Sequence, residues 1–188
     1  MTGINVISRY SSRSVGAEIR RVRFADMTID ARMPIYLSTG IEGPAPIADI
    51  AFSGITARGD TISYLGGSPG NPVTGITLRG VDLTMHGGAS NKPLNPGFPG
   101  SPSWTLRSCG VPCALAVADA DDVLLQDVRI RWEKPAGPWQ HGLFARDTRG
   151  LALSQVDLAS PPGGTAAVRC LRCGDYVRHR PNGEELLV

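Results

Sequence analysis

The stretch Ile47-Ala48-Asp49-Ile50-Ala51-Phe52-Ser53-Gly54-Ile55-Thr56-Ala57 decides the fold, because the spacing of its apolar residues recurs along the chain. Apolar side chains stand at a first position and again three, five, eight and ten residues later. The steps of two residues have the period of a β-strand, and the step of three between them shifts the phase. The stretch therefore predicts two short strands joined by a corner at Ser53-Gly54.

This spacing occurs five times, and the first residues of successive copies are separated by 28, 26, 47 and 28 residues. Small or polar residues recur at the same corner, and a third short apolar segment precedes most copies. Each repeat is therefore expected to hold three short strands and three turns. The copies begin at Ile19, Ile47, Val73, Ala120 and Thr148.

A repeat this short cannot bury its own apolar face and must stack on the next copy, as in a solenoid. Three strands per turn, each pairing with its equivalent in the next turn, describe a parallel β-helix. A leucine-rich repeat would need a leucine and asparagine consensus that is absent, and a β-sandwich would show hairpin turns. We predict an all-β, right-handed, single-stranded parallel β-helix of about six coils.

The whole chain, residues 1–188, is expected to form one β-helix domain. The longest spacing holds a stretch rich in Gly, Pro, Ser and Asn, which indicates an inserted loop over residues 86–111. The pattern breaks over residues 174–188, which are expected to cap the last coil. The repeat is already running at Ile4. We therefore expect a β-helix that lacks its N-terminal coils, or one whose first coil is covered by a partner or by a second copy.

Composition excludes several classes of function. The chain has 19 Lys and Arg against 17 Asp and Glu, a formal net charge of +2, without the basic cluster that a nucleic-acid partner requires. No apolar run approaches the roughly 20 residues that span a bilayer, so no membrane partner is expected. The N-terminus does not have the pattern of a signal peptide, and the compartment therefore stays open. No cofactor is indicated.

Four cysteines form two close pairs, Cys109 with Cys113 and Cys170 with Cys173. The pairs lie far apart and no histidine completes a compact set, so we expect no metal site. Small buried thiols are the favoured interpretation. Disulfides remain an alternative that would require an oxidising compartment.

Several stretches resemble the coils of glycoside hydrolase family 28, the polygalacturonase family. They are PIADIAFSGITA at 46–57, GGSPGNPVTGITL at 66–78, and GLFARD at 142–147 with GLAL at 150–153. The resemblance covers about residues 3 to 170. It implies the C-terminal portion of an inverting hydrolase of pectin, polygalacturonate or a related polysaccharide. Family members are usually secreted or periplasmic.

In the family, the catalytic motifs Asn-Thr-Asp, Asp-Asp and Gly-His-Gly normally lie upstream of the coils that the resemblance covers. The resemblance therefore implies that the catalytic coils are absent from this chain. The one Asp-Asp pair, Asp121-Asp122, falls in a turn before Val123. Inverting hydrolysis needs two suitably separated carboxyl groups. We therefore assign no catalytic residue, and we predict that this chain alone is inactive.

Four residues are candidates for substrate binding. The resemblance aligns Asn5-Val6-Ile7 with a family Arg-Ile-Lys motif, which loses both cations but leaves Asn5 able to hydrogen-bond a sugar hydroxyl. Strand alternation turns Tyr36 outward, where it is able to stack on a sugar ring or to pack in a ladder. Arg9 and Tyr10 form a polar-aromatic group suited to carboxylates. The expected partner is an acidic, pectin-like polysaccharide or oligosaccharide. The alternative function is a non-catalytic carbohydrate-binding or structural β-helix.

Overall fold

The computed structural model describes residues 2–8, 18–39, 46–87, 111–175, 177–179 and 185–187. Within these ranges the chain forms strands and turns, and none of it is a helix of the length and apolar character that a membrane crossing requires. The strands are β1 (Thr2–Ile7), β2 (Ile19–Asp30), β3 (Met33–Ser38), β4 (Ile47–Gly59), β5 (Ser63–Gly66), β6 (Val73–Gly87), β7 (Cys113–Pro135), β8 (His141–Ser154), β9 (Asp157–Leu158), β10 (Ala166–Leu171), β11 (Val177–His179) and β12 (Glu185–Leu187).

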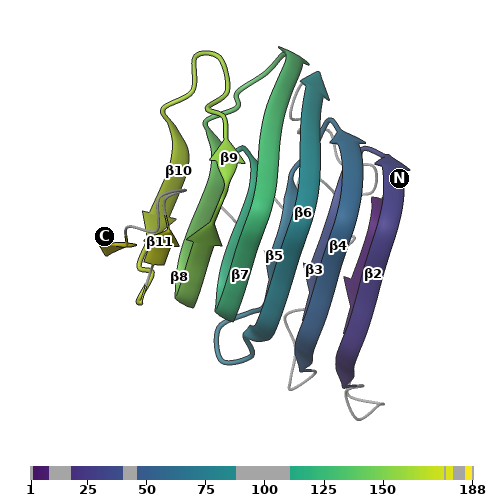
Figure 1. Cartoon of the computed structure of the whole chain (residues 1–188), viewed down its shortest axis with the longest axis vertical. Helices are drawn as coiled ribbons and strands as arrows, with labels where there is room; N and C mark the ends of the chain where they lie inside the picture. The colour runs from purple at the N-terminus through teal and green to yellow at the C-terminus, as the bar shows by residue number, and fades with distance from the viewer. Residues whose placement is uncertain are drawn as a thin grey trace.

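The strands stack as a right-handed parallel β-helix of about five turns, which confirms the predicted fold. The chain winds so that each strand pairs in parallel with its equivalent one turn later, and among the strands of the described residues β11 and β12 are the pair that runs antiparallel. Figure 1 shows β2, β4, β6, β7 and β8 side by side in coil order, with β3 and β5 behind them. The coil stack thus follows directly from the repeat in the sequence.

Three ladders of strands run along the β-helix. The first ladder has six strands: β1, β3, β5, the beginnings of β7 and β8, and β10. The second ladder joins the first halves of β2, β4 and β6 to the middle of β7 and the end of β8. The third ladder joins the second halves of β2, β4 and β6 to the end of β7 and to β9. Most long strands therefore bend at a corner and serve two ladders.

The predicted corner between the second and third ladders is made by one left-handed residue per coil. Its φ angle lies between 50° and 60° at Asp26, Gly54, Gly80, Asp127 and Gln155. Gly, Asp and Asn accept this conformation more readily than other residues, which explains why the corner reads as small or polar.

A second left-handed corner lies inside the first three-residue step of the repeat, a step to which the sequence pattern assigned no structure. It is formed by Arg21, Asp49, Gly75, Asp122 and Gly150, with φ between 55° and 66°. From Asp49 onward aspartate and glycine alternate at this corner, so the carboxylates do not stack on one another. The Asp49 carboxylate lies over Gly75, and the Asp122 carboxylate lies over Gly150.

The core is a continuous column of inward side chains from neighbouring coils. The repeat residues of β4, namely Ile47, Ile50, Phe52, Ile55 and Ala57, are each no more than 1% exposed. Their equivalents on β2, from Ile19 to Met27, are only partly buried, because no further strand of the described chain covers that end. Phe24 and Phe52 stack with their ring centroids 5.3 Å apart.

The C-terminal segment continues the stack before it changes direction. β11 pairs in parallel with the end of β8, and β12 turns back to pair antiparallel with β11. At the predicted inserted loop, β6 extends to Gly87 and β7 begins at Cys113. The intervening residues 88–110 lie outside the described residues.

Candidate functional site

The structure places two of the four predicted binding residues on the first ladder. Asn5 on β1 aligns with Tyr36 on β3, and the Asn5 side chain is exposed. Arg9 and Tyr10 lie outside the described residues.

Tyr36 turns away from the coil interior as predicted, and of the two roles left open by the sequence it has the ladder packing rather than an exposed ring for a sugar. The residue is 0% exposed and its ring stacks on Tyr64 with centroids 5.8 Å apart. A fully covered ring offers no surface to a sugar. Strand alternation gives the direction of a side chain but not what lies over it.

The outward side of the first ladder carries no carboxylate among the described residues. One outward row runs through Asn5, Tyr36, Tyr64, Ala116, Phe144 and Arg169, and the next through Ile7, Ser38, Gly66, Ala118, Arg146 and Leu171. Acid–base cleavage of a glycosidic bond therefore lacks its carboxyl pair on these rows.

Trp132 near the end of β7 and Trp139 just after it fasten this part of the chain to the β-helix. The indole N–H of Trp132 donates to the Ala159 carbonyl at 2.9 Å, and that of Trp139 donates to the Gly87 carbonyl at 3.1 Å. The two rings pack edge to face with centroids 5.1 Å apart. These contacts fit a packing role rather than a carbohydrate groove.

The outward side of the third ladder presents charged side chains in register. We call two of its rows the polar band, which crosses four coils at the arrowhead ends of β2, β4, β6 and β7 in Figure 1. One row pairs Asp30, Arg58, Thr84 and Arg131. The other row holds the paired His86 and Glu133 together with Arg32 and Asp60, which follow the ends of β2 and β4 and are joined by a backbone hydrogen bond. The row two residues earlier is also polar: Thr28, Thr56, Asp82, Arg129 and Asp157.

The polar band is internally paired but remains accessible. Arg58 donates to Glu133 with an Nη2–Oε2 distance of 2.7 Å, and both side chains are about half exposed. The Arg32 Nε lies 3.5 Å from the Asp60 Oδ1. Formally the band holds three arginines and three carboxylates, so its charges balance with histidine neutral.

A pocket of about 270 Å³ opens at the N-terminal end of the polar band, lined by Asp30, Ala31, Arg32, Asp60 and His86. The backbone supports it, because the Arg32 carbonyl accepts the backbone N–H of Asp60 at 3.1 Å and the backbone N–H of Thr61 at 2.8 Å. The pocket is thus lined by two carboxylates, a guanidinium and an imidazole. It lies beside a hydrogen-bonded turn between the third and first ladders.

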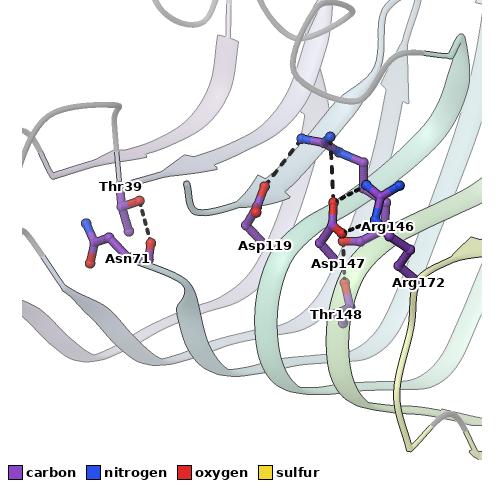
Figure 2. A network of polar contacts seen from close by, with 7 residues as sticks. All are labelled: Thr39, Asn71, Asp119, Arg146, Asp147, Thr148 and Arg172. Atoms are coloured by element: carbon purple, nitrogen blue, oxygen red, sulfur yellow. Dashed lines mark hydrogen bonds and ion pairs between the residues drawn. The ribbon is translucent and has the colours of Figure 1, made fainter. Parts of the chain in front are cut away.

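A separate ion-pair network lies at the corner between the first and second ladders (Figure 2). Arg146 lies 3.3 Å from Asp119 and 3.7 Å from Asp147, and Arg172 contacts Asp147 through two hydrogen bonds of 2.5 and 2.7 Å. Burial raises the pKa of Asp119 despite Arg146. The hydrogen bond from Arg172 lowers the pKa of Asp147. This network joins three coils. Both of its arginines are already paired with aspartates.

The remaining candidates have structural explanations. The carboxylate of Asp121 accepts two hydrogen bonds from Arg149, at 2.9 and 2.6 Å, so this aspartate of the Asp-Asp pair is used in a corner ion pair. His141 is 1% exposed, and its Nδ1 lies 3.2 Å from the Ala166 carbonyl. Burial lowers the pKa of His141. No group of three or more metal-ligating side chains gathers within the described ranges.

Sequence reasoning missed the polar band, although a signal for it was present. The position thirteen residues after the start of each copy is polar in the first four copies, as Arg32, Asp60, His86 and Glu133. The prediction of the fold rests on the apolar positions and the corners of the repeat, and it makes no use of these outward polar positions. Placing the same positions in register would have aligned these four side chains on one face.

We compared the chain with protein-family models, curated proteins and solved structures, and none of the three comparisons finds a match.

Proposed function

We propose that this chain is a carbohydrate-binding β-helix that holds a pectin-like polysaccharide along the polar band and does not cleave it. The observation that carries the proposal is the polar band itself, with its pocket at one end. Coils stack about 4.8 Å apart, so four coils offer a polar track about 14 Å long. An extended oligosaccharide lying across the strands would meet equivalent groups at each coil.

The chemistry of the polar band suits a ligand with both hydroxyl and carboxylate groups. Aspartate and glutamate accept hydrogen bonds from sugar hydroxyls, and arginine binds carboxylates through two donors. The exposed Arg58–Glu133 pair contributes little to stability, so it opens at low cost when a ligand competes for either partner. A partly esterified uronide polymer presents both kinds of group.

The resemblance to family 28 supports the ligand class, and the absence of a carboxyl pair on the described outward rows of the first ladder supports the lack of cleavage. The pocket takes one sugar ring. Its volume lies just below the roughly 300 Å³ at which pockets for drug-sized ligands begin.

Calorimetric titration with oligogalacturonides of increasing length, both free and methyl-esterified, tests the proposal. We expect binding that tightens with length, and a loss of affinity of about tenfold for Asp60→Asn or Arg131→Gln, roughly one lost hydrogen bond to a charged group. Asp121→Asn and Arg149→Gln change the same residue types away from the band and should bind like the parent chain. No binding at millimolar ligand, or equal losses in all four variants, would reject the polar band as the site.

A second candidate function is self-association through the first coil. Ile19, Val22, Phe24 and Met27 on β2 are partly exposed at repeat positions that are buried on β4, and β2 pairs with β4 as its one partner in the described chain. The occupant we propose is a second copy. Antiparallel pairing of two β2 strands about a twofold axis would set the basic half, Arg20 to Arg23, against the acidic half, Asp26 to Asp30.

Sedimentation over a range of protein concentrations tests this second candidate. We expect a monomer–dimer equilibrium that Phe24→Asp removes. Leu171→Asp provides the control, because Leu171 is the exposed large apolar residue at the opposite end of the stack. A monomer at every concentration, or equal sensitivity to both variants, would argue against pairing through β2.

A further inference from the structure

Two cysteines flank the corner at Arg172, where the chain leaves the last strand of the first ladder. Cys170 on β10 aligns with the inward residue Ala145 of β8. Cys173 follows the left-handed residue Arg172, as Thr148 follows the left-handed residue Asp147 one coil earlier. The two cysteines therefore occupy the inward positions on either side of one corner.

The hydrogen bonds of this corner repeat those of the preceding coil. The Thr148 hydroxyl donates to the Arg146 carbonyl at 2.9 Å, and the Cys173 thiol donates to the equivalent carbonyl of Leu171 at 3.7 Å. Cys170 and Cys173 also influence each other, since each shifts the pKa of the other thiol, and the two shifts run in opposite directions. Both side chains are partly exposed, whereas Cys113 is fully buried.

We propose that Cys170 and Cys173 form a redox-active dithiol that closes to an intramolecular disulfide by exchange with a small-molecule disulfide such as oxidised glutathione. A Cys-x-x-Cys spacing at a turn brings two sulfurs within bonding reach without moving neighbouring strands. This inference concerns a different end of the molecule from the polar band and does not rest on carbohydrate binding.

The reaction balances as two successive exchanges. The Cys173 thiolate attacks one sulfur of oxidised glutathione, forms a mixed disulfide and releases one glutathione thiolate, which takes up a proton. The Cys170 thiol then loses its proton and attacks the Cys173 sulfur, releasing the second glutathione. The two cysteines lose two electrons, and one molecule of oxidised glutathione gains them.

The surroundings assign the two roles. The hydrogen bond from Cys170 lowers the pKa of Cys173 to about 6, and the same contact together with burial raises the pKa of Cys170. Cys173 is thus the attacking thiolate and Cys170 the resolving thiol. The charged groups around the corner are Arg172, which lies between the cysteines, and Asp147 and Asp119, while Arg146 completes the network of Figure 2.

Peptide mapping of the intact chain tests the proposal directly. Trypsin cleaves after Arg169, Arg172 and Arg178, so the two cysteines fall in separate peptides, 170–172 and 173–178. After incubation with oxidised glutathione we expect these peptides to be joined by a disulfide that reduction separates. Cross-links from either cysteine to Cys109 or Cys113, or two stable glutathione adducts, would overturn the assignment.

The pH dependence of alkylation separates a reactive pair from two ordinary thiols. The labelling rate of Cys173 should reach its plateau near neutral pH, since its pKa is about 6 rather than 9.0. Cys170→Ala removes the donor and should move this profile to higher pH. Cys170→Ser keeps a donor, so it should retain the low profile and accumulate the mixed glutathione disulfide. The roles assigned to Cys173 and Cys170 would be refuted if the labelling rate of the parent chain rose with pH as that of an ordinary thiol does. They would also be refuted if the Cys170→Ala and Cys170→Ser variants gave the same pH profile.

Discussion

At the scale of single residues, the backbone conformation of the corners explains why few residue types occur at the corner positions of the repeat. At a fixed place in each coil, the alternation of inward and outward side chains must shift by one position. A single residue in the left-handed conformation is enough to make this shift. Glycine adopts that conformation freely, whereas a residue with a Cβ pays about 1–2 kcal/mol. The corner ladders are therefore built mainly from Gly and Asp.

Gly80→Ala should lower the free energy of unfolding by about 1–2 kcal/mol, because its φ of 60° is unfavourable for alanine. An added Cβ meets no atom closer than 3.8 Å, so the loss reflects conformation rather than a clash. Urea denaturation measures it. Gly80→Asn is the control and should lose less, since asparagine tolerates this region. Equal stability of the parent and Ala variants would contradict this account of the corner.

Asp147→Asn should destabilise the chain at neutral pH and have less effect in acid. Arg172 holds the folded-state pKa of Asp147 below 3.8, its ordinary value. The stabilisation is therefore fully present above that value and is lost as the pH falls through the depressed folded-state pKa. Asparagine keeps the side-chain shape and suits the left-handed φ of 48°.

Denaturation of the parent and Asp147→Asn chains at neutral pH and in acid measures this difference. The stability gap should narrow on acidification, whereas Asp157→Asn on the exposed strand β9 should show no comparable change. If the stability difference between the parent and Asp147→Asn chains does not change with pH, the ion pair between Arg172 and Asp147 does not stabilise the fold. The burial of Asp119, whose pKa is raised, acts in the opposite direction and makes the parent less stable as that carboxyl ionises.

At the scale of the coil, each element contributes to stability through its neighbours above and below. β4 lies between β2 and β6, so its inward side chains are enclosed on both sides. Within the described residues, β2 has a neighbouring strand on one side only. Identical residues in consecutive coils therefore differ in what their removal costs.

Phe52→Ala should cost about 3–5 kcal/mol of unfolding free energy, the usual range for a buried phenylalanine. Phe24→Ala deletes the same side chain from the same stacked pair but should cost clearly less, because Phe24 is partly exposed. Denaturation of the two variants at low protein concentration makes the comparison. Equal costs would show that the first coil is covered as completely as the second.

At the scale of the whole molecule, the fold is a regular scaffold and its possible functions depend on which face is polar. The outward side of the third ladder is polar over four coils, whereas the outward side of the first ladder is largely buried. The outward side of the third ladder is therefore more open to a ligand than that of the first, on which sugar contacts at Tyr36 were expected.

The purified chain should release no reducing ends from polygalacturonate, with or without methyl esters. The physical reason is that the outward rows of the first ladder carry no acid–base carboxyl pair in the described residues. A reducing-sugar assay over a range of pH checks this, with a commercial polygalacturonase as the positive control. Activity that disappears in Asp30→Asn and Asp60→Asn chains would instead assign catalysis to the pocket.

The candidate site shows the limit of reading a repeat for its apolar positions alone. The polar residues thirteen positions into each copy are visible in the sequence, but their alignment depends on pairings such as Asp60 with Arg32 across a turn. For Tyr36, the alternation of side chains along the strand predicts the direction of the ring. It does not predict that the ring is buried.

What the sequence by itself determined is the stacked winding of the chain, because the spacing of inward residues is local and each coil repeats the pairing of the one before. It also placed the corner at Gly54 and its equivalents. Only the tertiary structure decided which outward faces remain open and that Asp30 and His86 share a pocket. Those outcomes join residues from different coils, whose contacts depend on register and covering segments rather than on any local pattern.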